Sequence, residues 1–162
     1  MTKVLLYGFG NPGRRDDGLG IAFVDKIEQW ALSAGKTNME FESNYQLNIE
    51  DAEVIAGKDL VIFADASREE ISDYCVSKVD ESSKVAFTSH EASPGYVVKL
   101  CKDLFGNAPP AYLVHIRGYD WDFAEGLSEK ALENLDKAVA CFLDILEKPE
   151  TFIEGTKNVK FC

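Results

Sequence analysis

The stretch GFGNPGRRDDGLG, residues 8–20, directly follows the apolar run VLLYG and leads into a segment with helical periodicity. A continuous apolar run is typical of a parallel strand that is buried on both faces. After the stretch, apolar residues recur at spacings of four, four and three, which defines one face of a helix: Leu19, Phe23, Ile27 and Trp30. Residues 8–20 are therefore predicted to form the tight turn from a first strand to a first helix.

The rest of the chain continues this alternation of strands and helices. Further strands are predicted at residues 39–43, 59–66, 74–79, 84–88 and 111–118, of which 74–79 alternates in polarity and is typical of an edge strand. Further helices are predicted at residues 49–57, 94–106 and 129–148; the first ends near Gly57, and Ser93 and Ser128 cap the other two, which end at Gly106 and before Pro149. The expected fold is a three-layer α/β/α domain over residues 1–148, with a twisted, mostly parallel sheet, helices on both faces and one antiparallel edge. Residues 149–162 show no periodicity and are expected to form a surface extension or to be partly disordered.

The composition restricts the partners of this domain. Its 162 residues are enough for one domain, and its net charge of −11 argues against nucleic acids and anionic membranes as main partners. No apolar stretch approaches the roughly 20 residues that a membrane-spanning helix needs, and the start of the chain carries no export signal. We therefore expect a cytoplasmic protein. Its four cysteines form no C-x-x-C pair and are expected to be reduced, with Cys101 and Cys141 in the core and Cys162 exposed.

The first six letters of the stretch match G-x-G-x-x-G, the pattern of a dinucleotide-binding loop. However, Asp16 and Asp17 follow where the helix begins, and carboxylates there repel a bound pyrophosphate. A nucleotide-binding oxidoreductase that uses NAD or flavin remains the alternative function. One of the two aspartates is expected to cap the helix, which leaves the other free for a different role.

Three polar side chains follow predicted strands at the edge where ligands gather in open α/β sheets. Asp17 follows the first strand, Asp65 closes the strand LVIFAD, and His90 follows the strand KVAFT. Two carboxylates and an imidazole form a ligand set that suits nickel, zinc or a similar divalent ion. The second histidine, His115, lies inside an apolar strand and is interpreted as a packing residue. A Ser-His-Asp site has little support, because no G-x-S-x-G motif is present.

Three motifs resemble those of the nickel–iron hydrogenase maturation proteases. GFGNPGRRDDGLG is similar to the family's opening motif, DLVIFADAS to its second motif, and TSHEASPG to its third, in the same order along the chain. The resemblance implies a phosphorylase/hydrolase-like fold and an endopeptidase that removes a C-terminal extension from a hydrogenase large-subunit precursor after nickel insertion. It also implies that Asp17, Asp65 and His90 contact the metal and carry the catalysis.

The resemblance leaves two pictures of the metal open. In one picture the three residues contact a nickel ion that the substrate already holds; in the other the enzyme keeps its own ion. Either the metal or a carboxylate then activates water. The expected partner is the precursor and the expected state is a monomer; a non-catalytic metal-binding module with the same fold is a further alternative. Glu91 is expected to orient His90, and Arg117 either grips a substrate carboxylate or forms a structural salt bridge.

Overall fold

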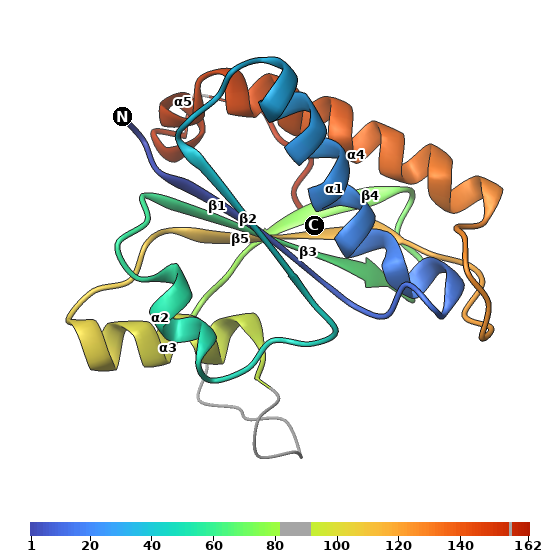
Figure 1. The fold of residues 1–162 in the computed structure, drawn as a ribbon, viewed down its shortest axis with the longest axis horizontal. Helices are drawn as coiled ribbons and strands as arrows, with labels where there is room; N and C mark the ends of the chain where they lie inside the picture. The colour runs from blue at the N-terminus through green and yellow to red at the C-terminus, as the bar shows by residue number, and fades with distance from the viewer. Residues whose placement is uncertain (82–91, 156) are drawn as a thin grey trace.

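The computed structural model describes residues 1–81, 92–155 and 157–162, and within them a single sheet has the strand order β2-β1-β3-β5-β4 (Figure 1). Its strands are β1 Val4–Phe9, β2 Met39–Asn44, β3 Leu60–Ser67, β4 Tyr74–Lys78 and β5 Ala111–Arg117. Strands β2, β1, β3 and β5 are parallel, and β4 pairs antiparallel with β5. The prediction of a mostly parallel sheet with one antiparallel edge is confirmed, whereas the strand predicted at 84–88 lies outside the described residues.

Helices cover both faces of the sheet, which confirms the three-layer α/β/α prediction (Figure 1). The long helices α1 and α4 share one apolar cluster with one face, and α2 and α3 share a second cluster with the other face. The helices are α1 Leu19–Ser33, α2 Asp51–Ile55, α3 Pro94–Phe105, α4 Glu129–Glu147 and α5 Pro149–Ile153, and a 3-10 turn, η1 Arg15–Gly18, precedes α1. None of the helices described is both long and apolar enough to cross a membrane.

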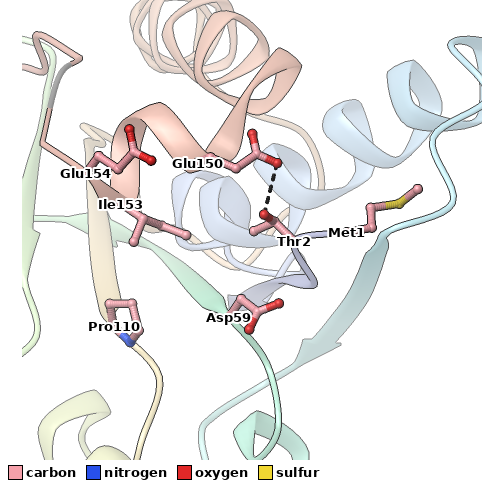
Figure 2. Close-up of a pocket in the computed structure, with 7 residues that line it drawn as sticks. All are labelled: Met1, Thr2, Asp59, Pro110, Glu150, Ile153 and Glu154. Atoms are coloured by element: carbon pink, nitrogen blue, oxygen red, sulfur yellow. Dashed lines mark hydrogen bonds between the residues drawn. The ribbon is translucent and has the colours of Figure 1, made fainter.

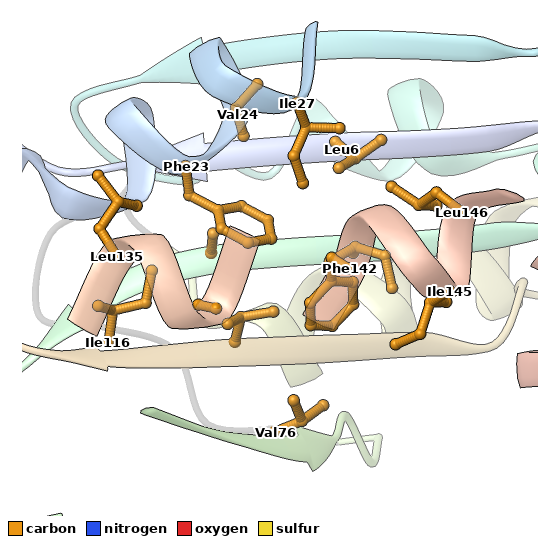
Figure 3. Close-up of a cluster of buried hydrophobic side chains, with 14 of the residues drawn as sticks. Leu6, Phe23, Val24, Ile27, Val76, Ile116, Leu135, Phe142, Ile145 and Leu146 are labelled. Carbon is orange, nitrogen blue, oxygen red and sulfur yellow. The ribbon is translucent and has the colours of Figure 1, made fainter. Parts of the chain in front are cut away.

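The apolar face predicted for α1 packs against buried apolar residues of α4 above the sheet (Figure 3). Phe23 of α1 and Phe142 of α4 are both fully buried, and their rings meet edge to face with centroids 5.4 Å apart. The helix starts also follow the sequence signals. The Oγ atoms of Ser93 and Ser128 accept hydrogen bonds from the N–H groups of Tyr96 and Ala131, so each serine caps the helix that follows.

The C-terminal tail is more firmly attached to the domain than its sequence indicates. Phe152 of α5 is buried in the main core, although the segment lacks periodicity. Further on, the N–H of Val76 donates to the carbonyl of Lys160, and the N–H of Cys162 donates to the carbonyl of Val76. The end of the chain therefore runs parallel to the edge strand β4, which departs from the surface extension expected for it; the division at residue 148 stays a prediction.

A disulfide bond joins Cys162 to Cys75 of β4. The expectation of reduced thiols is wrong for these two residues, although Cys162 is exposed as expected. It is right for Cys101 and Cys141, which are free thiols, buried and half-buried respectively. The pairing could not be inferred from local sequence because 87 positions separate the two cysteines.

Breaking this disulfide should destabilise the domain. Because it closes a loop with a sequence separation of 87, the chain-entropy model gives a loss of about 4.5 kcal/mol in the free energy of unfolding, within the roughly 2–5 kcal/mol that removing a native disulfide costs. We expect Cys162→Ala to lower the urea midpoint accordingly. A reducing agent should produce the same shift in the wild type and none in the variant, and a shift of equal size in both would contradict the assignment.

Candidate functional site

The turn between β1 and α1 packs so closely that side chains are excluded at two of its glycines. Gly10 has a φ of 135°, and a Cβ atom there would lie 2.1 Å from the carbonyl oxygen of Asp17. A Cβ atom on Gly20 would lie 2.3 Å from the carbonyl oxygen of Ala64 in β3. These glycines therefore allow the start of α1 to approach β1 and β3, and the backbone of Asp17 fills the space that Gly10 provides.

Asp16 is fully buried and holds the turn to a distant loop. Its carboxylate accepts four hydrogen bonds of 2.7–2.9 Å from three residues: Tyr119 N–H, Asp120 N–H, and both N–H and Oγ of Ser128. Burial by itself raises the pKa of Asp16, but the bonds from Ser128, Tyr119 and Asp120 outweigh it, and the pKa is lowered from its ordinary value.

Neither aspartate caps α1, contrary to the prediction. The N-cap position of α1 is Gly18, and no side chain hydrogen-bonds to that end of the helix. The reason is that the one-turn 3-10 helix η1 precedes α1 and contains both aspartates. Instead, Asp17 Oδ2 accepts a hydrogen bond of 2.8 Å from the N–H of Asn11, across the turn. Asp17 is thus fixed from two sides, by this bond and by its neighbour Asp16.

Asp17 and Asp65 line the same cavity of about 210 Å³, at the edge of the sheet where β1 and β3 end. Asp65 has one hydrogen bond, from the N–H of Ala66 to its Oδ1 at 2.8 Å. Burial raises the pKa of Asp65 to about 7; the bond from Ala66 opposes this shift and the nearby charge of Asp17 adds to it. The structure therefore brings together two of the three predicted site residues, in contrasting environments.

The third predicted residue, His90, lies outside the described residues, and so does Glu91. Ala92, two positions after His90 in the sequence, does line the cavity, and its N–H donates to the carbonyl of Leu47. Across residues 1–81, 92–155 and 157–162, no three His, Cys, Asp or Glu side chains lie together as metal ligands would. The role of His90 stays a prediction.

The two carboxylates can act chemically in two ways. A pair in which one carboxyl carries a raised pKa can hold one proton and one negative charge near neutral pH, the arrangement that general acid–base chemistry requires. Two carboxylates in an open cavity are also suitable ligands for a divalent cation, particularly when an imidazole completes the set. The sequence and the geometry both permit either use.

His115 is a packing residue with one polar contact, as its position in β5 indicates. It is half-buried, and its Nε2 lies 2.8 Å from Ser77 Oγ. Burial lowers its pKa, against an opposing effect of Glu69. In the sheet register His115 is the neighbour of Asp65.

The loop 118–127 follows β5 and borders the strand ends of the sheet, and its contacts were not predicted from the sequence. Arg15 pairs with Asp120, with Nε and Oδ2 3.2 Å apart. Arg117 donates from Nη1 to the carbonyl of Ile71. This contact is a structural hydrogen bond, whereas either a substrate carboxylate or a structural salt bridge was expected at Arg117 from the sequence. Nothing in the local sequence pairs these residues, because their partners lie on other segments.

A larger hollow, of about 640 Å³, lies at the opposite edge of the sheet (Figure 2). Its lining residues include Thr2, Asp59 and Pro110, which precede β1, β3 and β5. Two of its carboxylates already bind the start of the chain: Asp59 accepts from the N–H of Lys3, and Glu150 accepts from Thr2 Oγ1. This hollow lies at the starts of the parallel strands, whereas ligands bind at their ends in open α/β sheets, and none of the predicted site residues lines it.

Comparison with solved structures identifies the architecture. The chain is similar in structure to a [NiFe] hydrogenase maturation protease HycI from Thermococcus kodakarensis KOD1, with a TM-score of 0.69 and 21% identity. The similarity covers 91% of this chain and 94% of that protein's chain. The hydrogenase maturating endopeptidase HybD from E. coli covers the same shares, with a TM-score of 0.65 and 19% identity. The chain has the fold of the [NiFe] hydrogenase maturation proteases. No protein-family description and no curated protein matches the sequence itself.

The raised pKa of Asp65 predicts that Asp65→Asn stabilises the protein at high pH. Between about pH 4 and 7 the folded protein keeps a proton that the unfolded chain has released, so this carboxyl lowers the free energy of unfolding as the pH rises. The gain from an uncharged amide should reach at most about 4 kcal/mol at pH 8 and nearly vanish at pH 4. Thermal unfolding of both proteins across this range measures it, with exposed Asp122→Asn as the control; an unchanged or lower stability at pH 8 would refute the expectation.

The lowered pKa of Asp16 leads us to expect the opposite pH dependence of the free energy of unfolding. Its lowered pKa contributes stability that is present above the ordinary pKa of 3.8 and is lost as the pH falls below it. An amide cannot accept the same four bonds, so Asp16→Asn should cost about 3 kcal/mol or more at pH 7. Urea unfolding at pH 7 and pH 3 should show a large loss that narrows in acid, whereas Asp122→Asn should match the wild type at both.

Proposed function

We propose that this chain is an endopeptidase that removes the C-terminal extension of a [NiFe] hydrogenase large-subunit precursor after nickel insertion. One observation carries the proposal: Asp17 and Asp65, the acids of the first two motifs, line one cavity at the strand ends of a maturation-protease fold. The two segments that bear them are 48 positions apart in the sequence. Their meeting is therefore a consequence of the fold rather than of local sequence.

In this proposal nickel belongs to the substrate and is the mark that the enzyme recognises. Asp17, Asp65 and His90 would contact it, since carboxylate oxygens and an imidazole suit a divalent ion of this kind. The cavity supports this assignment, because Asp65 is a partly buried carboxyl with one hydrogen bond, and burial raises its pKa to about 7. A bound cation would stabilise the ionised form of Asp65 and polarise a neighbouring carbonyl group.

The chain's own residues would handle the proton. With both carboxylates ionised beside the cation, Asp17 or Asp65 would take a proton from the water molecule that attacks the scissile carbonyl and return it to the leaving amine. The bond from Asn11 N–H to Asp17 Oδ2 leaves the other oxygen of Asp17 for this work. Asp17 would act as the better oriented of the two acids, because both the turn and Asp16 hold it in place.

The proposed partner is the precursor alone, met by a monomeric enzyme in the cytoplasm. Disulfides are rare in the cytosol outside hyperthermophiles, so the Cys75–Cys162 bond bears directly on this location. Trapping thiols in intact cells before lysis would determine whether the pair is oxidised there.

A processing reaction tests the proposed activity. We expect the wild type to trim nickel-loaded precursor from its own organism and to leave nickel-free precursor intact, as followed by the mass of the large subunit. Asp17→Ala should reduce processing by at least a hundredfold, because it removes both a metal contact and a catalytic carboxylate. Asp122→Ala, in the neighbouring loop, should process at the wild-type rate.

Two outcomes would contradict separate parts of the proposal. Equal trimming of loaded and nickel-free precursor would eliminate nickel as the recognised feature while leaving the peptidase. Nickel binding with no trimming of any precursor would favour the non-catalytic metal-binding module. The nucleotide-binding alternative is not favoured, because the similar solved structures are hydrogenase maturation proteases and the acids of the first two motifs line one cavity.

A further inference from the structure

All four arginines of this acidic chain lie at one end of the molecule. Each of them contacts the loop 118–127, which borders the strand ends near Asp17 and Asp65. The contacts are Arg14 with Trp121 and Phe123, Arg15 with Asp120, Arg68 with Trp121, and Arg117 with Tyr119. The 13 remaining basic residues are lysines spread over the rest of the sequence. The arginines are therefore concentrated at the loop 118–127, and the lysines are not.

Three of the four guanidinium groups already contact oxygen atoms of the protein. Arg14 donates from Nε and Nη2 to the carbonyl of Trp121, at 3.2 and 3.1 Å. Arg117 donates to the carbonyl of Ile71 at 2.9 Å, and Arg15 pairs with the carboxylate of Asp120. These three arginines are part of the loop's own support.

Arg68 differs from the other three. Its side chain is exposed, and its Cζ atom lies 4.0 Å from the ring centroid of Trp121. Among the residues that the structure describes, no carboxylate forms an ion pair with Arg68, although Glu69 and Glu70 follow it directly. Stacking occupies only the face of the guanidinium plane, so the N–H groups along its edge remain available as donors.

The ring beneath Arg68 is firmly held. Arg14 binds the carbonyl of Trp121, and the ring packs over Gly118, where a Cβ atom would lie 2.8 Å from Trp121 Cη2. Asp16 fixes the N–H groups of the two preceding residues, Tyr119 and Asp120. The Arg68–Trp121 stack is therefore pre-organised, which lowers the entropy lost when a ligand binds to it.

We propose that Arg68, stacked on Trp121, binds a carboxylate of the polypeptide substrate. Arg68 lies three residues after Asp65 and one after the last residue of β3, so it belongs to the same edge of the sheet as the cavity. A planar guanidinium with free edge donors matches a carboxylate in a bidentate geometry. The inference rests on the proposed function for the identity of the substrate, and the carboxylate is either the C-terminus of the extension or an Asp or Glu side chain.

Kinetics of processing test the role of Arg68. We expect Arg68→Gln to raise KM about tenfold with little change in kcat, because the contact is formed in substrate binding and is not part of the bond cleavage. Arg68→Lys should recover only part of the loss, since an ammonium group cannot form the bidentate pair. Lys3→Gln, an equal change of charge before β1 at the opposite edge, should leave both constants unchanged. Thermal unfolding of each variant checks that the fold is retained.

Changes to the substrate identify the source of the carboxylate. One precursor carries a C-terminal amide, and a second has the Asp and Glu residues of its extension replaced by Asn and Gln. The modification that removes the bound carboxylate should weaken processing by the wild type about tenfold and by Arg68→Gln not at all. If both modified precursors lower wild-type and variant processing by the same factor, Arg68 does not bind a carboxylate of the extension.

Direct binding separates this inference from the proposed activity. Surface plasmon resonance with nickel-loaded precursor measures the Kd without any cleavage, in the wild type, Arg68→Gln and Lys3→Gln. Weaker binding by Arg68→Gln alone would support the carboxylate site even if the wild type trimmed nothing, in which case only the peptidase proposal would fail. Equal Kd values for all three proteins would overturn the inference, whatever the processing assay shows.

Discussion

The buried carboxylate of Asp16 is the contact on which the strand-end side of this molecule depends. A fully buried charge is costly unless hydrogen bonds surround it, and here four donors from the 118–128 region supply them. One of these donors is Ser128, which also caps α4. Asp16 therefore joins the first turn, the loop after β5 and the start of the longest helix. Asp17, the next residue along the chain, takes its position from that junction.

The carboxyl group of Asp65, unlike that of Asp16, has few hydrogen bonds within the protein. Asp16 lies in the turn after β1 and Asp65 near the end of β3, yet the first carboxylate accepts four hydrogen bonds and the second accepts one, from the N–H of Ala66. Burial raises the pKa of both carboxyl groups, but the hydrogen bonds to Asp16 outweigh this effect, so its pKa is lowered, whereas the pKa of Asp65 rises to about 7. A carboxyl that the fold leaves incompletely balanced, beside a second carboxylate in a cavity, is a frequent feature of functional sites.

The parts of the structure that local sequence determines were predictable, and those that depend on distant partners were not. Apolar runs and helix caps lie within single segments, so the five strands that the structure describes, the three layers and the antiparallel edge followed from them. The meeting of Asp17 with Asp65 also followed, because parallel strands end at the same edge. The donors to Asp16 lie 103 to 112 positions away, and Cys75 and Cys162 lie 87 positions apart. No short-range pattern could pair them, nor could one place Arg68 against Trp121.

The strand order explains why the candidate site lies between β1 and β3 rather than elsewhere along the edge. From β1 the chain passes through α1 to β2, and it then returns through α2 to β3 on the other side of β1. Since α1 and α2 cover opposite faces of the sheet (Figure 1), the connections diverge there and leave a crevice at the strand ends. Gly20 allows α1 to lie directly against the carbonyl of Ala64 in β3. The fold thus places the carboxylates of Asp17 and Asp65 at the crevice where open α/β sheets bind ligands, which is why we propose these two acids as the contacts to the substrate's nickel.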